Sequence, residues 1–168
     1  RAYFGTYNPA GWSGELTANP IDVNTGVVSS TATWSASSQL TSRDWTTRVI
    51  ASHNGTTGVG FTVAAVGSTV NPSSTYGDTT LLMNYLRGDR TGEGTSWRRR
   101  TSLMGAIINS EPVVSREDGV VYVASGEGML HAFDTTTPDQ GKELWAFVPR
   151  AVLPDIGQTS QRSYTFKT

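Results

Sequence analysis

Three short apolar runs, the first of them bounded by glycines, follow one another in the C-terminal third of the sequence. The first run is rich in β-branched residues, and the two-residue connection Glu127-Gly128 leads from it into the second. So short a connection joins antiparallel strands, and we expect Gly126 and Gly128 to supply the positive φ angles of a tight hairpin. The pattern predicts an antiparallel three-stranded meander. Its strands are expected at residues 119–126, 128–134 and 142–148.

The same order of residues occurs twice along the chain. Residues 14–34 and 128–145 both contain Gly-x-Leu-x-Ala, then Asp, then Gly, then Trp. This order describes a strand with Leu and Ala on one face, a turn that begins at Asp, and a returning strand with an indole. We interpret the Leu and Trp of each copy as structural anchors, and we expect both indoles to be buried between sheets. These anchors are Leu16, Trp34, Leu130 and Trp145. Two matches at loose spacing also arise by chance, and this alternative stays open.

The composition agrees with a protein of strands and turns. Thr (24), Ser (18) and Gly (18) supply 60 of the 168 residues, whereas Lys occurs only twice, which argues against a helical bundle or coiled coil. A net charge of −1 argues against nucleic acid as a partner. No apolar run approaches the roughly 18 residues of a membrane span. The absence of cysteine excludes disulfides and thiolate metal sites.

The middle of the chain differs in character. Residues 41–50 start with a capping candidate and carry a weak apolar stripe, which predicts a short helix. A second helix is predicted after Asp78, because this N-cap residue precedes apolar residues at helical spacing and Gly88 supplies a stop. The stretch 67–80, rich in Gly, Ser and Thr, is expected to be a loop.

Four motifs follow one another at residues 82–90 (LMNYLRGDR), 103–113 (LMGAIINSEPV), 121–134 (VYVASGEGMLHAFD) and 146–154 (AFVPRAVLP). Together they resemble motifs of the PilY1 (or PilC) family of type IV pilus tip proteins. Residues 82–90 (LMNYLRGDR) resemble the end of a helix in that family, and residues 121–134 (VYVASGEGMLHAFD) resemble its hairpin. The chain departs from the family at Ala106, where the family has an acidic residue, and at Glu111, where it has a small one. Upstream of the four motifs, residues 12–16 (WSGEL) and Leu40 also match the family.

The resemblance implies an all-β fold, namely a portion of a modified quinoprotein-type β-propeller built from antiparallel meander blades. On this interpretation the chain is the N-terminal portion of the family's C-terminal propeller domain. Its expected parts are a blade-like segment at 1–40, an insert with one or two short helices at 41–106, and a second blade-like segment at 107–168. A closed propeller needs at least four blades of roughly 40 residues each, so this chain does not close a ring alone. The start at Arg1 rather than Met also leads us to interpret the chain as a piece of a longer protein.

The resemblance also implies a function. Members of the family act in type IV pilus biogenesis, oppose pilus retraction and adhere to surfaces, at the pilus tip or in the outer membrane or periplasm of Gram-negative bacteria. The expected protein is not an enzyme, and its expected partners are minor pilins, the remainder of its own chain and host-cell receptors. No cofactor is expected in this segment, and calcium is expected elsewhere in the full-length domain. The alternatives are a quinoprotein dehydrogenase with pyrroloquinoline quinone and a generic propeller scaffold.

A search for reactive or metal-binding motifs yields little. Asp22-Val23-Asn24-Thr25-Gly26 offers two calcium ligands but lacks the rest of a binding loop, and an Asx turn explains it better. His53 and His131 are far apart and lack zinc-ligand spacing, and we interpret His131 as a hydrogen-bonded strand residue. Gly11-Trp12-Ser13-Gly14 falls one residue short of the nucleophile elbow of serine hydrolases. Neither a catalytic nor a metal site is predicted.

Arg87-Gly88-Asp89 is a candidate adhesive corner. It matches the integrin-type tripeptide, and the polar, glycine-rich continuation leads us to expect that it projects into solvent, where Arg87 and Asp89 engage a partner. The alternative is an ordinary helix C-terminus, in which Gly88 is the cap and Arg87 faces the negative end of the helix dipole. Arg98-Arg99-Arg100 is interpreted as a solvated face or as salt bridges within the protein rather than as a nucleic-acid site.

Overall fold

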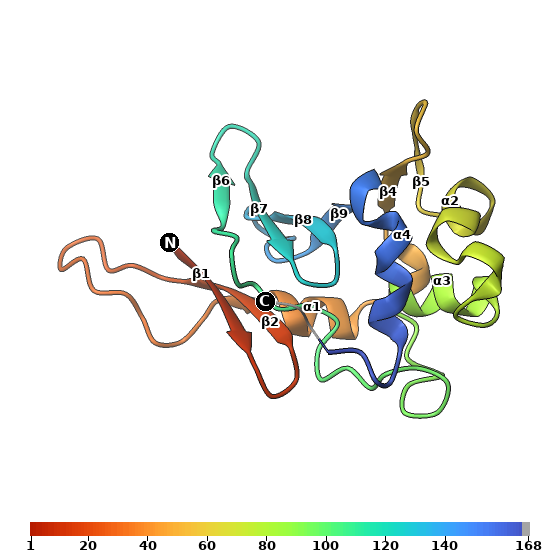
Figure 1. The fold of residues 1–168 in the computed structure, drawn as a ribbon. Coiled ribbons are helices and arrows are strands. Elements are labelled where there is room, and N and C mark those ends of the chain that lie inside the picture. Colours follow the sequence, from red (N-terminus) through yellow and green to blue (C-terminus); the bar gives the residue numbers. More distant parts are fainter. Residues whose placement is uncertain (166–168) are drawn as a thin grey trace.

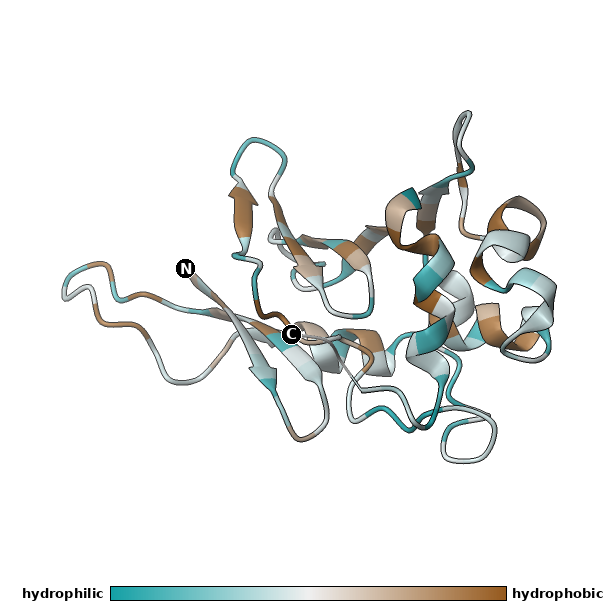
Figure 2. Ribbon diagram, in the orientation of Figure 1, coloured by the Kyte–Doolittle hydropathy of each residue, from teal (hydrophilic) through white to brown (hydrophobic). Residues whose placement is uncertain are grey.

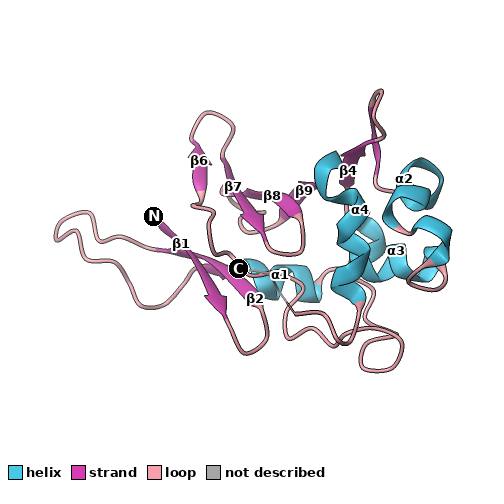
Figure 3. Ribbon diagram, viewed as in Figure 1, coloured by secondary structure: helices cyan, strands magenta, loops and turns pink. Residues whose placement is uncertain are grey.

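Two β-sheets form the framework of the chain (Figures 1 and 3). The computed structural model describes residues 1–165. A three-stranded sheet contains β1 (Ala2–Asn8), β2 (Ser13–Asn19) and β3 (Trp34–Ser35) in that order. A six-stranded sheet has the strand order β5-β4-β9-β8-β7-β6. Its strands are β4 (Ile50–His53), β5 (Gly58–Gly60), β6 (Val113–Ser115), β7 (Val120–Ser125), β8 (Met129–Asp134) and β9 (Glu143–Phe147).

Short helices lie around the two sheets. α1 (Ala36–Ser42) follows β3, whereas α2 (Val63–Val70), α3 (Thr79–Arg87) and α4 (Leu153–Ile156) gather near β4 and β5 (Figure 1). Single 3-10 turns lie at 45–47, 72–74, 150–152 and 157–160. The described residues thus form more sheet than helix and no closed barrel, which agrees with the expected all-β class.

The meander predicted from the sequence is present as β7, β8 and β9. These strands pair antiparallel, with one irregularity of register between Ala132 and Phe133. Gly128 has a φ of 90° in the first turn, as expected. The expectation for Gly126 is wrong, because this residue keeps an ordinary φ and its N–H donates to the carbonyl oxygen of Ala106 at 2.8 Å. The turn therefore also binds the segment that precedes β6.

The middle of the chain contributes two strands, β4 and β5, to the same sheet. β4 and β5 form a hairpin, and β4 pairs in parallel with β9, where Ile50 lies opposite Ala146. The hydroxyl of Ser52 donates to the carbonyl oxygen of Val148 at 2.9 Å and strengthens this junction. Residues 41–106 thus extend the meander sheet and also carry α2 and α3.

The helix predicted after Asp78 is confirmed as α3. The Asp78 side chain accepts a hydrogen bond from the N–H of Leu81, and Gly88 ends the helix with a φ of 128°. Both features are local, since the cap residue and the stop residue act within one helical turn of the ends.

The other predictions for the middle of the chain are wrong. No helix spans 41–50, because Ser35 caps α1 further upstream and Asp44 caps a separate 3-10 turn. The stretch 67–80 is not a continuous loop, because Thr62 caps α2, which runs into it. In α2, burial of Val66 and Val70 outweighs the low helix propensity of β-branched residues.

Both hydrophobic clusters lie on one face of the six-stranded sheet, as the alternation of side chains along its strands requires. The first cluster packs the three-stranded sheet and α1 against Val121, Val123 and Phe133. The second packs α2, α3 and α4 against Ile50, Met129 and Ala146. Residues of the opposite face belong to neither cluster.

The strand register turns the sequence repeat into a repeated structure. Each sheet has a row of Tyr, Ala and Trp that lie opposite one another on three neighbouring strands. The first ladder consists of Tyr3, Ala18 and Trp34. The second ladder consists of Tyr122, Ala132 and Trp145. The centroids of the Tyr and Trp rings are 6.0 Å apart in the first ladder and 5.7 Å apart in the second.

The four predicted anchors differ in burial. Leu16 is fully buried, and Trp34 is 6% exposed between the two sheets. Leu130 and Trp145 are partly exposed, so the expected burial of Trp145 between sheets is not found within the described residues. The reason is that the second ladder lies on the face that neither cluster covers.

We predict that Trp34→Ala lowers the free energy of unfolding by about 3–5 kcal/mol, because it removes an indole packed against the ring of Phe133 at 6.1 Å. Urea unfolding measures this loss. The control is Val23→Ala, a change at a 93% exposed side chain, which should shift stability by less than about 0.5 kcal/mol. Equal, small shifts for the two variants would contradict the packing described here.

Candidate functional site

Four charged side chains form a continuous row in the interior. Glu127 lies in the turn between β7 and β8, His131 in β8, Glu143 at the start of β9, and Arg48 just before β4. Nε2 of His131 is 2.9 Å from Oε1 of Glu127, and its Nδ1 is 2.8 Å from Oε1 of Glu143. The His131, Glu143 and Arg48 side chains are 0%, 1% and 3% exposed. We call these four residues the charged quartet.

Arg48 and Glu143 make the most extensive contact of the quartet. Nε of Arg48 donates to Oε2 of Glu143 at 2.7 Å, and Nη2 donates to Oε1 at 2.8 Å. Nη1 of Arg48 donates to the carbonyl oxygen of Arg87 at 2.8 Å, and the Arg87 side chain donates back to the carbonyl oxygen of Arg48 at 2.9 Å. Such two-pronged pairing fixes position as well as charge. It ties the end of α3, the start of β4 and β9 together.

The surroundings of the quartet stabilise its charged forms. Burial alone would lower the pKa of His131, but hydrogen bonds to Glu127 and Glu143 outweigh burial and raise the pKa to about 9. Burial would raise the pKa of Glu143, but His131 and Arg48 lower it to about 2. For Glu127 the hydrogen bond from His131 likewise outweighs burial, and the pKa is lowered. At neutral pH the quartet therefore holds two cations and two anions, and its net charge is zero.

Ser125, His131 and Glu143 have the outline of a hydrolytic triad. The hydroxyl oxygen of Ser125 is 2.9 Å from Nε2 of His131, whose Nδ1 faces Glu143. A general base must accept the proton of the nucleophile, which requires an unprotonated Nε2. Here Nε2 also faces the carboxylate of Glu127, and the raised pKa keeps the imidazole doubly protonated at neutral pH. The arrangement therefore positions Ser125 without activating it.

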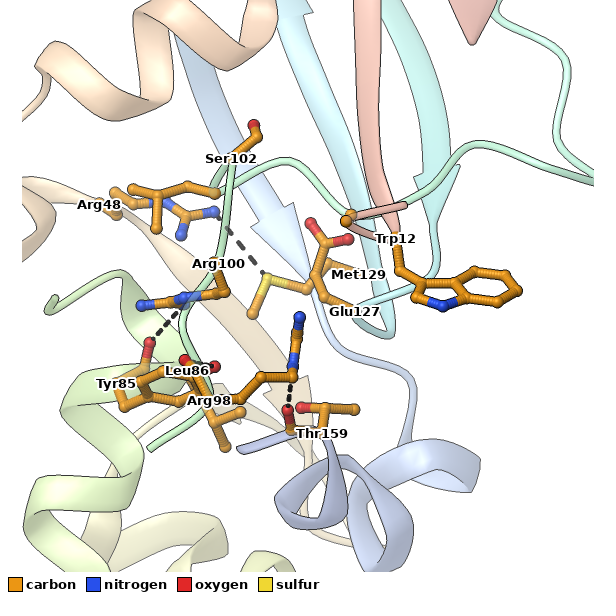
Figure 4. Close-up of a pocket in the computed structure, with 13 residues that line it drawn as sticks. Trp12, Arg48, Tyr85, Leu86, Arg98, Arg100, Ser102, Glu127, Met129 and Thr159 are labelled. Carbon is orange, nitrogen blue, oxygen red and sulfur yellow. Dashed lines mark hydrogen bonds between the residues drawn. The ribbon is translucent and has the colours of Figure 1, made fainter. Parts of the chain in front are cut away.

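A small cavity lies beside the quartet (Figure 4). Its lining comes from the β1–β2 turn, the end of α3, the segment 98–105 and the β7–β8 turn. Oε2 of Glu127 is buried there without a hydrogen bond from any described residue, against Gly105, where a side chain would collide with it. The cavity volume is about 30 Å³, which fits one or two water molecules. The space suits hydration of a carboxylate rather than binding of a substrate.

The Arg87-Gly88-Asp89 corner does not project into solvent, and that expectation is wrong. Gly88 is buried, and Arg87 is partly buried. The guanidinium of Arg87 turns inward, where it donates to the carbonyl oxygens of Arg48 and Phe61. An integrin-type site needs this guanidinium to be free, so the geometry agrees with the alternative, an ordinary helix C-terminus.

Asp89 stabilises the loop that follows α3. Its Oδ1 accepts hydrogen bonds from the N–H of Thr91 at 2.9 Å and from the Thr91 hydroxyl at 2.5 Å. Its carbonyl oxygen accepts from Nη2 of Arg100 at 2.8 Å. The carboxylate and the main chain of Asp89 are therefore both engaged within the protein.

The Arg98-Arg99-Arg100 run mostly makes contacts within the chain. Arg100 pairs with Glu93 at 2.7 Å, and its guanidinium lies 3.8 Å from the centre of the Tyr85 ring. Nε of Arg98 donates to the carbonyl oxygen of Thr159 at 3.0 Å. The interpretation as internal salt bridges holds for Arg100, whereas Arg99 is exposed.

The remaining candidates from the sequence are local features. Asp22 accepts hydrogen bonds from the N–H groups of Asn24 and Thr25, which confirms the Asx turn. His53 accepts from the N–H of Gly55. Within residues 1–165, no cluster of three or more His, Cys, Asp or Glu side chains is arranged to hold a metal ion. No helix in that range is long and apolar enough to cross a membrane.

The sequence reasoning missed three of the four quartet members. It identified His131 as a hydrogen-bonded strand residue, which is confirmed, but not Glu127, Glu143 or Arg48 as its partners. Alternation did not signal Glu143, because it groups this residue with Trp145 and Phe147 on the face that neither hydrophobic cluster covers. The register irregularity between Ala132 and Phe133 instead sets Glu143 opposite Phe133 and turns its carboxylate into the core. A charged residue at such a position requires a buried partner of opposite charge.

Comparison with known proteins gives the chain a family. A type IV pilus biogenesis factor PilY1 homolog of Xylella fastidiosa is 35% identical over 91% of this chain, which spans 14% of that relative. Type IV pilus biogenesis factor PilY1 of Pseudomonas aeruginosa strain PAK is 32% identical over 48% of the chain, which covers 9% of that relative. PilY1 of strain UCBPP-PA14 is 28% identical over 91% of the chain, which covers 16% of that relative. No family model and no solved structure matches.

These relatives share one family name, and two of the alignments cover nearly the whole chain. The chain belongs to the PilY1 family. It spans less than a fifth of the length of the curated relatives it matches.

We predict that the charged quartet makes stability depend on pH. Because the pKa of His131 rises from 6.5 to about 9 on folding, its contribution is complete below pH 6.5 and is lost as the pH rises through 9. Because the pKa of Glu143 falls from 4.5 to about 2, its contribution is present above pH 4.5 and is lost as the pH falls toward 2. Stability should peak between pH 5 and 6.5. It should decline by an amount on the order of 3 kcal/mol by pH 9.

Urea unfolding at several pH values measures this profile. His131→Gln should be less stable at pH 6 and should lose the decline between pH 6.5 and 9. His53→Gln is the matched control, because His53 is the other histidine of the chain and lies outside the quartet. An unchanged alkaline decline in His131→Gln would contradict the prediction.

We also predict that Arg87→Ala destabilises the chain by about 1–3 kcal/mol, because it leaves the carbonyl oxygens of Phe61 and Arg48 without their donor. Thermal unfolding measures the loss. Arg99→Ala removes an exposed guanidinium and should leave the unfolding temperature nearly unchanged. If Arg87→Ala unfolds at the temperature of the parent protein, the guanidinium does not hold the end of α3.

Proposed function

We propose that this chain is a structural segment of a type IV pilus biogenesis factor that acts without catalytic chemistry. The observation that carries the proposal is the 35% identity over 91% of the chain to a protein named for that role. Because the chain spans 14% of this relative, the role belongs to the whole protein, and the segment contributes a framework to it.

The chemistry of the interior supports a non-enzymatic role. Three of the four quartet side chains are buried, the quartet is electrically neutral, and its histidine stays protonated at neutral pH, so Ser125 has no base to activate it. The cavity beside it has a volume of only about 30 Å³. These features stabilise a fold but do not provide a reacting group with room for a substrate.

The finer role follows from the family. We propose that the whole protein acts at the pilus tip or in the outer envelope, opposes pilus retraction and takes part in adhesion. Its proposed partners are minor pilins, the remainder of its own chain and receptors on host cells. We further propose that this segment holds no cofactor and that calcium binds elsewhere in the protein. In support, the carboxylate of Asp22 is used within its own turn.

The test uses the full-length protein in its own bacterium. Deletion of its gene should abolish surface pili and twitching motility, and the parent gene should restore both. A gene with Ser125→Ala should restore both within about twofold, because only a positioned hydroxyl is lost. Sheared surface pilin, twitching zones and the level of the protein are measured together.

Glu143→Gln is the matched change within the quartet. It leaves Arg48 and His131 with an uncompensated charge, which is expected to cost about 3–5 kcal/mol and to lower the protein level together with piliation. Piliation in the deletion strain would contradict the biogenesis role. Loss of piliation by Ser125→Ala at a normal protein level would contradict the non-enzymatic role.

A further inference from the structure

The hairpin of β4 and β5 projects from the end of the six-stranded sheet, and its tip contains Asn54 followed by Gly55 (Figure 1). Figure 2 shows no strongly hydrophobic residue at this tip. Residues 54–57 are all exposed, so water reaches them freely. In an Asn-Gly sequence the next main-chain nitrogen can attack the asparagine side chain, because glycine has no side chain to block the approach. This dipeptide occurs once in the chain.

His53 contacts the nitrogen that would attack. The N–H of Gly55 donates to Nδ1 of His53 at 3.0 Å, so this ring nitrogen carries a lone pair and no proton. A main-chain amide becomes a nucleophile when its proton is removed, and an imidazole in hydrogen-bond contact with that proton is suited to act as the general base. His53 lies at the end of β4, where strand pairing sets it opposite Gly58. The folded chain therefore keeps the base and the nucleophile together.

The side-chain carbonyl group of Asn54 is polarised by two donors. Its Oδ1 accepts hydrogen bonds from the N–H of Thr56 at 2.9 Å and from the N–H of Thr57 at 3.0 Å. Attack on the carbonyl carbon places negative charge on this oxygen, and two main-chain N–H groups stabilise such a charge as an oxyanion hole does. The turn fixes both donors before the reaction begins, whereas an unfolded chain does not.

A positive charge lies beside the attacking nitrogen. A Cβ on Gly55 would come within 3.0 Å of Cζ of Arg150, so the guanidinium rests against the main chain of this glycine. A cation there favours loss of the N–H proton and attracts a carboxylate that forms next to it. Gly55 also has a φ of 108°, which residues with a side chain rarely adopt. Both the space and the backbone conformation at this position therefore require glycine.

We propose that the tip of the β4–β5 hairpin is a self-modifying site, at which Asn54 loses its amide and becomes a mixture of isoaspartate and aspartate. His53 takes the proton of the Gly55 nitrogen, and this nitrogen bonds to Cγ of Asn54. The side-chain oxygen becomes an anion held by the N–H groups of Thr56 and Thr57. The bond between Cγ and Nδ2 then breaks, and the protonated histidine returns its proton so that ammonia leaves. A cyclic imide remains.

Water completes the reaction, so the net change is the loss of ammonia and the gain of water. A water molecule adds to either carbonyl group of the imide and breaks the bond from that carbon to nitrogen. One opening gives aspartate, and the other gives isoaspartate, in which the main chain runs through Cγ. Either product places a carboxylate near Arg150 where a neutral amide stood. The reaction occurs once in each molecule and turns over no substrate, so it does not depend on the proposed function.

Peptide mass spectrometry of the purified full-length protein tests the proposal without a mutation. The protein is incubated at neutral pH, either native or unfolded in guanidinium chloride, and deamidation is followed over time. Asn54 should react at least threefold faster in native protein, because only the folded tip holds the base and the donors in place. Asn109, an exposed asparagine followed by Ser110, is the internal comparison and should react more slowly than Asn54 in native protein. A smaller ratio of native to unfolded rates would overturn the proposal, because the turn would not promote the reaction.

Two substitutions test the groups around the nitrogen. His53→Gln keeps an oxygen that can accept the N–H of Gly55 but removes the group that takes its proton. The native rate at Asn54 should then fall to about the rate of the unfolded protein. Arg150→Gln should slow the reaction at least twofold, whereas Arg99→Gln, a change at another exposed arginine, should not. Thermal unfolding verifies that each variant is folded during the incubation. An unchanged rate in folded His53→Gln would overturn the role of the histidine.

The identity of the product tests the imide. A methyltransferase specific for isoaspartate transfers a labelled methyl group to that isomer and not to aspartate. The peptide that contains residue 54 should become labelled in incubated parent protein and should stay unlabelled in Asn54→Gln. A product that consists of aspartate alone would indicate direct hydrolysis by water and would overturn the proposed reaction.

Discussion

The buried pair between Arg48 and Glu143 is the interaction on which the rest of the structure depends. Removing two charges from water costs several kcal/mol per ion unless partners and hydrogen bonds compensate. Here both carboxylate oxygens of Glu143 accept hydrogen bonds, and its carbonyl oxygen accepts one from Arg43. The pair joins residues 95 positions apart and brings β4 beside β9. His131 and Glu127 extend it into a neutral quartet, so that no net charge remains in the interior.

The two faces of the six-stranded sheet differ in what they carry. The quartet and the hydrophobic clusters lie on one face, and the second ladder lies on the other. On one face, burial of apolar side chains and the neutral quartet hold the helices and the three-stranded sheet in place. The other face repeats the Tyr-Ala-Trp row that elsewhere in the chain serves as a contact surface. Alanine suits the middle of such a row, because a larger residue would separate the two rings that lie near one another across it.

The charges of the interior favour a framework over a catalyst. A triad-like arrangement of Ser125, His131 and Glu143 differs from a hydrolase in one respect, the second carboxylate at Glu127, which keeps the histidine protonated. The Arg87 guanidinium, whose tripeptide matches an adhesive motif, is turned toward main-chain oxygens. In both cases the residue types are those of a functional site, and the contacts of the surrounding partners agree with a structural role.

Features that depend on neighbours in sequence were determined by the sequence itself. Asp78 and Gly88 define α3, Gly128 closes a hairpin, and the repeat predicted related sheets, because caps, turns and alternation act over a few residues. The tertiary structure alone decided which distant groups meet. The parallel pairing of β4 with β9 and the inward turn of Arg87 depend on partners dozens of residues away. Local patterns do not encode such partners, because burial and charge pairing are properties of the assembled chain.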